Sequence, residues 1–193
     1  RRKTNMNSTS PLSKIKLLNP EFPNKSTGII NGKSSGILNW NDIAYPQMYE
    51  LYQTLLSNFW KAQEINMQDD IKQWDQLIEV EQDVFLRINT QLASLDSLQT
   101  PTMSQVMDYV TDSSFKAIFA VISQQEAVHN ESYSYILSSL VPLDIQNERF
   151  NQAKNDPVVQ ERNQLILDAY ELFRKNPTPE NLLKLSVNSI NLE

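Results

Sequence analysis

No glycine or proline interrupts the stretch from Ser113 to Leu140, and its composition is compatible with helix throughout. This stretch therefore predicts one long helix. The chain has three glycines, all before residue 40. Such scarcity argues against β-rich and doubly wound folds, which need many tight turns. The sequence predicts an all-α protein, most simply a helical bundle.

Apolar residues at helical spacing predict further helices on both sides of this stretch. Residues 1–38 are rich in Asn, Ser, Lys, Pro and Gly and lack periodicity, which indicates an extended or disordered arm. Residues 39–193 are expected to form a single helical domain. The expected helices cover about 46–60, 70–98, 103–110, 113–140, 143–153, 157–175 and the stretch from 179 onward.

Polar residues and prolines predict where several of these helices begin and end. Pro101 is expected to interrupt the chain after the second helix. Asp112 or Ser113 is expected to cap the long helix. Thr178 is expected to cap the last helix, with Pro179 as its first residue.

Charge and composition exclude several classes of function. The net charge is −6 and no basic cluster follows the first three residues, which argues against nucleic acid or an anionic membrane as a partner. No apolar run approaches the roughly 20 residues of a membrane helix. The absence of cysteine excludes disulfides and thiol chemistry and fits a cytoplasmic location.

Three chemically capable side chains lie on one face of the long helix. Glu126 and His129 are three residues apart, and Tyr133 follows His129 by four, so helical periodicity aligns them. The same face runs back through apolar positions such as Phe119, so it is expected to be buried. An unpaired charge there costs several kcal/mol, roughly, and requires compensation. A metal ion would provide it, as would a basic partner, a hydrogen-bonded core histidine or a solvated face.

A second carboxylate falls on an apolar stripe of a different helix. Asp96 lies eight residues after Ile88 and four after Leu92, which places it on the core-facing side of the expected 70–98 helix. The alternative is that Asp96 faces solvent at a fraying helix end. Glu193 lies eleven residues after Leu182, again on an apolar face.

Two segments together resemble one known family. Residues 93–99 (Ala-Ser-Leu-Asp-Ser-Leu-Gln) and 125–135 (Gln-Glu-Ala-Val-His-Asn-Glu-Ser-Tyr-Ser-Tyr) resemble the small (β, radical-generating) subunit of class I ribonucleotide reductase. Residues 58–60 (Asn-Phe-Trp) and 64–67 (Glu-Ile-Asn-Met) look like the family's segment ahead of the first ligand helix. The resemblance covers about residues 40–193 and implies the N-terminal part of a ferritin-like bundle.

The resemblance also implies roles for individual residues. Tyr133 matches the tyrosine that is oxidised to a radical, and Trp60 matches a tryptophan implicated in electron transfer. Carboxylates with imidazole suit iron or manganese. The implied ligands of a dinuclear iron or manganese centre are Asp96, Glu126 and His129 for one metal and Glu193 for the other.

The implied function is ribonucleoside-diphosphate reduction in deoxyribonucleotide synthesis, with the radical passed to a separate large (α) subunit and the small subunit forming a homodimer. The family has a second Glu-x-x-His, whereas this chain contains a single histidine, His129. A C-terminal remainder of the small subunit is therefore an expected partner if the chain is split or truncated. Two alternatives are another ferritin-like metalloprotein, with a Glu126/His129 pair from each chain at a dimer interface, and a non-catalytic helical interaction protein.

Overall fold

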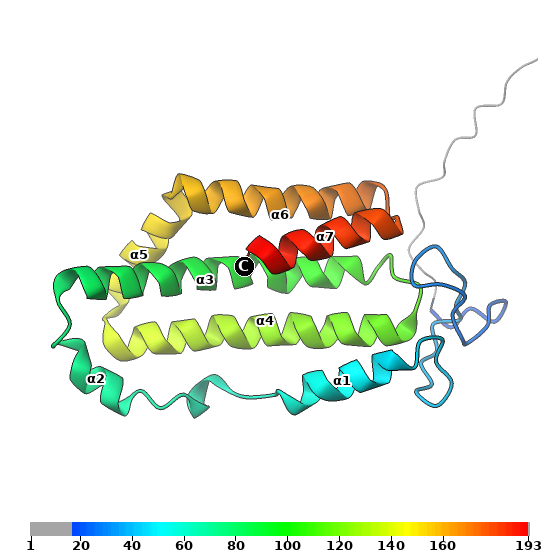
Figure 1. Cartoon of the computed structure of the whole chain (residues 1–193), viewed down its shortest axis with the longest axis horizontal. Coiled ribbons are helices and arrows are strands. Elements are labelled where there is room, and N and C mark those ends of the chain that lie inside the picture. The colour runs from blue at the N-terminus through cyan, green and yellow to red at the C-terminus, as the bar shows by residue number, and fades with distance from the viewer. Residues whose placement is uncertain (1–16, 193) are drawn as a thin grey trace, which may run out of the picture.

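A computed structural model describes residues 17–192 of the chain (Figure 1). The described part is helical, and its one β feature is an isolated antiparallel bridge between Ile30 and Val110. This confirms the predicted all-α fold. None of the described helices is long and apolar enough to cross a membrane. The helices are α1 (Gln47–Ser57), a short 3₁₀ helix η1 (Ala62–Glu64), α2 (Gln68–Trp74), α3 (Glu79–Val106), α4 (Ser113–Leu140), α5 (Leu143–Asn155), α6 (Pro157–Lys175) and α7 (Pro179–Leu192).

The two longest helices, α3 and α4, lie antiparallel and side by side (Figure 1). The segment from α1 to α2 runs along α4 on the side away from α3. On the other side of α3 lie α6 and α7, joined to the pair through α5. Buried apolar residues from α3, α6 and α7 form the main core cluster together with residues outside helices: Ile30, Leu95, Val106, Val110, Ile166, Ala169, Tyr170, Phe173 and Leu185.

Helix α4 has the bounds that its sequence predicts. Its N-cap is Asp112, whose carboxylate accepts hydrogen bonds from the backbone N–H of Ser114 at 2.9 Å and of Phe115 at 3.1 Å. Such a cap satisfies N–H groups that have no partner within the helix. The predicted cap of α7 is also present, because the Thr178 hydroxyl accepts from the backbone N–H of Asn181 at 3.2 Å.

Helix α3 differs from the prediction at both ends. The expected 70–98 helix is divided into α2 and α3, because Ile78 is extended and its N–H donates to the Glu81 carboxylate at 3.0 Å, which starts a new helix. The expected interruption at Pro101 is wrong, since α3 continues through it to Val106. A proline inside a helix costs about 3 kcal/mol. Burial of the following turn, including Val106 at 1% exposure, offsets this cost.

Part of the segment expected to be an extended or disordered arm packs onto the helices. Residues 1–16 lie outside the described part of the chain, whereas Ile30 is buried in the main core cluster. The Ile29 carbonyl accepts the backbone N–H of Thr111 at 2.6 Å. The side chain of Asn31 donates to the Pro177 carbonyl at 2.8 Å. Through these contacts, residues 29–31 bridge the α3–α4 connection and the α6–α7 connection. The sequence did not predict this packing, because the segment has no hydrophobic periodicity.

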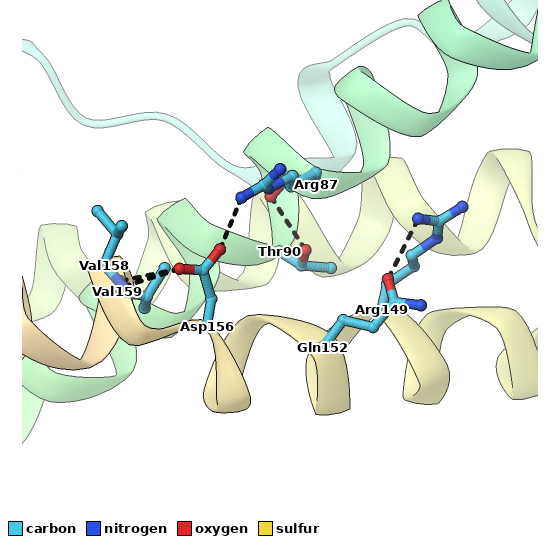
Figure 2. Close-up of polar contacts among 7 residues, drawn as sticks. All are labelled: Arg87, Thr90, Arg149, Gln152, Asp156, Val158 and Val159. Carbon is cyan, nitrogen blue, oxygen red and sulfur yellow. Dashed lines mark hydrogen bonds and ion pairs between the residues drawn. The ribbon is translucent and has the colours of Figure 1, made fainter.

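Charged side chains fasten the α5–α6 corner to α3 (Figure 2). The Arg87 guanidinium donates to the Asp156 carboxylate at 2.7 Å, and Asp156 also caps α6 through the backbone N–H of Val158. Arg149 bonds Asp83 and, at 3.2 Å, the Gln152 side chain. These polar groups surround a cavity of about 250 Å³.

The hydrogen bond between Arg87 and Asp156 is expected to make the stability of the protein depend on pH. The hydrogen bond from Arg87, and then that from the Val158 N–H, lower the pKa of Asp156 below its ordinary value of 3.8. A lowered folded-state pKa contributes stability that is present above the ordinary value and is lost as pH falls through the folded value. We expect Arg87→Met to lower the free energy of unfolding at pH 7, with a difference from wild type that shrinks below pH 3.8.

Urea unfolding of both proteins across this pH range measures the difference. Arg174→Met, at an exposed position in the last turn of α6, is the matched control and is expected to show no such pH-dependent difference. If the difference in the free energy of unfolding between Arg87→Met and wild type stays constant down to the lowest pH, Arg87 does not stabilise the ionised Asp156 carboxylate.

Candidate metal centre

Helices α3 and α4 bring three of the expected ligand residues together. Asp96 lies on α3, and Glu126 and His129 lie on α4. One ligand atom from each residue lies within 4.8 Å of the others. The two carboxylate residues are each 7% exposed. His129 Nδ1 and Glu126 Oε2 are 3.8 Å apart, and the imidazole remains 43% exposed.

This donor set fits iron or manganese. Two carboxylates and one imidazole are the hard and intermediate ligands that these ions accept, and the chain has no thiolate to favour zinc. Two carboxylates buried near each other are unfavourable unless a cation compensates their charge. The set is nevertheless small for a dinuclear centre. Glu193, the fourth residue expected from the sequence, lies outside the described residues.

Hydrogen bonds between the two helices fix their register on both sides of this cluster. The Asn130 side chain donates to the Ala93 carbonyl at 2.8 Å and to the Ser97 hydroxyl at 2.9 Å. About two turns away along α4, the Ser123 hydroxyl donates to the Thr100 carbonyl at 2.8 Å. Sequence reasoning missed these contacts, because a helical pattern does not show which helix a polar side chain will face.

Trp60 lies against the imidazole of the cluster. Its ring centroid is 5.9 Å from that of His129, with the planes inclined by 31°. The segment that carries Trp60 is held on α4 at two points. The Gln125 side chain donates to the Leu55 carbonyl at 3.1 Å, and the Gln63 side chain donates to the Glu131 carboxylate at 2.8 Å.

Tyr133 lies on α4 one turn beyond His129 and is half-buried. Seven residues separate it from Glu126, so both side chains leave the helix in nearly the same direction. Helical geometry therefore puts Tyr133 on the same face of α4 as Glu126, and its role at the cluster stays a prediction.

The all-helical fold, in which two buried carboxylates and a partly exposed imidazole meet between α3 and α4, is that of ferritin-like helical proteins. Residues 37–192 match the family described as ribonucleotide reductase, small chain, and the chain belongs to this family.

Individual relatives agree with this assignment. The ribonucleoside-diphosphate reductase subunit beta of Halalkalibacterium halodurans is 49% identical over 182 residues, which are 94% of this chain and 53% of that protein. The structure of the ribonucleotide reductase R2 subunit from Clostridium botulinum is 30% identical with a TM-score of 0.85, and the match covers 95% of this chain and 58% of that one. The dimanganese(II) NrdF structure from Streptococcus sanguinis is 27% identical with a TM-score of 0.72. The match covers 81% of this chain and 53% of that one. The chain spans about half the length of these relatives.

Proposed function

We propose that this chain supplies the first half of the dinuclear iron or manganese site of a ribonucleoside-diphosphate reductase small subunit. The observation that carries the proposal is the convergence of Asp96, Glu126 and His129 within 4.8 Å between α3 and α4, with both carboxylates buried, in a chain of this family. These three residues hold one metal. Glu193 contributes to the ligand set of the second metal.

In this proposal, individual residues of the chain have separate roles in forming the radical. When bound, the metal pair supplies the oxidising power that removes one electron and one proton from a phenol. Tyr133 is that phenol, and its hydroxyl gives up the hydrogen to leave a tyrosyl radical. Its half-buried position on α4 limits access of water and reductants. Trp60, 5.9 Å from the His129 ring, provides a route for an electron to the site.

The proposed partners follow from the names of the relatives. A subunit beta implies a large (α) subunit. In the proposed function that subunit receives the radical and reduces the ribonucleotide. The absence of cysteine from this chain is consistent with the reducing thiols lying on that subunit. We place the complex in the cytoplasm, with the small subunit as a homodimer. The match spans about half of the relative's length, and the remaining helices of the small subunit are a further proposed partner if they lie on a separate polypeptide.

Removal of a single carboxylate tests the metal site. Glu126→Ala is expected to weaken Mn(II) binding at least about 100-fold. Loss of a residue that only hydrogen-bonds to a metal ligand already weakens metal binding roughly 10–100-fold, and Glu126 is proposed as a direct ligand. Glu131→Ala is the matched control, since Glu131 is an exposed carboxylate on the same helix that bonds Gln63 instead. Titration with Mn(II), followed by electron paramagnetic resonance of the free ion, measures both affinities. Equal affinities for the two variants would refute the proposed site.

A further inference from the structure

A buried polar pair links α3 to α6 inside the apolar core. The Tyr170 hydroxyl donates to Gln99 Oε1 at 2.9 Å across 71 residues of sequence. Gln99 is 0% exposed and Tyr170 is 3% exposed. Tyr170 belongs to the main core cluster, so this hydrogen bond lies in an otherwise apolar environment, where such bonds are strong and strongly orienting.

The orientation of the Gln99 amide follows from this bond. Because Oε1 accepts the Tyr170 hydroxyl, the amide nitrogen, which carries two donors, is left for a different acceptor. Buried donors in folded proteins have acceptors. Asp96 lies three residues before Gln99, and side chains three apart are neighbours on a helix surface. Its carboxylate, 7% exposed, is therefore an acceptor within reach of the Gln99 amide.

We propose that Gln99 is a positioning residue for Asp96: Tyr170 fixes the amide, and the amide N–H orients the carboxylate toward Glu126 and His129. The proposal rests on the proposed metal site and adds two residues to it. Metal ligands are commonly held in this way, since ligating carboxylates are themselves hydrogen-bonded and their partners tune affinity. The sequence offered a signal for Gln99, a polar residue one turn from Asp96 on the same side. It offered none for Tyr170.

Conservative variants separate positioning from core packing. Gln99→Met keeps the volume of the side chain and removes the amide, and Tyr170→Phe removes one hydroxyl. We expect Gln99→Met to weaken Mn(II) binding about 10-fold and Tyr170→Phe to weaken it less. Both should change the resonance line shape of bound Mn(II), which reports the arrangement of its ligands.

The matched control for the phenol is Tyr109→Phe. Tyr109 packs edge-on against Phe173 of the same core cluster, with ring centroids 5.8 Å apart, so its variant deletes the same group near the same core. We expect wild-type affinity and line shape for this control. Equal losses for Tyr109→Phe and Tyr170→Phe, or an unchanged Gln99→Met, would overturn the proposal.

A second measurement needs no metal. In the metal-free chain, urea unfolding of Asp96→Ala, Gln99→Met and the double variant gives a double-mutant cycle. Contact between the two side chains predicts non-additive shifts of the unfolding midpoint, and additive shifts would refute it. If Gln99→Met does not fold, Tyr170→Phe replaces it in the cycle. If the wild-type chain binds no Mn(II), the proposed function is refuted. The double-mutant cycle would still decide whether Gln99 contacts Asp96.

Discussion

Mixing the chain with a polypeptide that carries the later Glu-x-x-His helices of the family is expected to raise bound metal from one weakly held ion to two tightly held ions per complex. In the proposed site the chain alone supplies three ligands of one metal, Asp96, Glu126 and His129, and Glu193 is the expected ligand of the second. Its single histidine cannot serve both metals. A second metal therefore requires donors from another polypeptide segment.

The surface of the helices supports the same expectation. On α3, Val84 is 49% exposed and Ile88 is 50% exposed. A groove of about 450 Å³ between α6 and α7 is bordered by Leu165, Leu172 and Leu183, each exposed by at least 44%. Apolar area of this kind gains about 25 cal/mol per Å² when it is covered. Helices that cover these positions would therefore be held on the chain by apolar contacts.

Metal analysis of the mixture, together with its mass in solution, measures the outcome. The mixture prepared with Glu126→Ala is the control and should hold at most one metal per complex. The alternative of a site shared by two copies predicts instead that the purified chain alone is a stable dimer with a full metal pair. That observation would contradict the expectation.

Replacing Tyr133 by Phe is expected to abolish the tyrosyl radical of the reconstituted complex and to leave its metal content nearly intact. Phenylalanine has no hydroxyl hydrogen to give up, and it keeps the aromatic ring of the side chain. Tyr133 lies one turn beyond His129 on the same helix, and it is the phenol that the proposed site would oxidise.

Electron paramagnetic resonance of the radical, with metal content measured on the same sample, tests this expectation. Tyr135→Phe is the matched control, since Tyr135 is also half-buried on α4 but two residues further, and thus on another face. A radical that survives in Tyr133→Phe and disappears in Tyr135→Phe would assign the role to Tyr135.

Local interactions explain what could be predicted from the sequence. The absence of breakers between residues 113 and 140, with Asp112 before them, determined the bounds of α4, because helix propensity and capping act within a few residues. Helical periodicity placed Glu126 and His129 on one face for the same reason. The burial of Asp96 agrees with the prediction, although Ile88, from which its spacing was counted, is half-exposed, and the family resemblance depended on these residues in combination.

Only the tertiary structure decided the features that depend on residues far apart in the chain. Helix α3 continues through Pro101 because burial of the next turn outweighs a local preference to stop. The Asn130 bonds to α3 span 33 and 37 residues, and the bond between Tyr170 and Gln99 spans 71. A periodic pattern shows which side of a helix is buried, but the identity of the facing residue depends on how the helices pack. The sequence therefore determined the candidate ligands, and the packing of α3 against α4 decided that Asp96 meets Glu126 and His129.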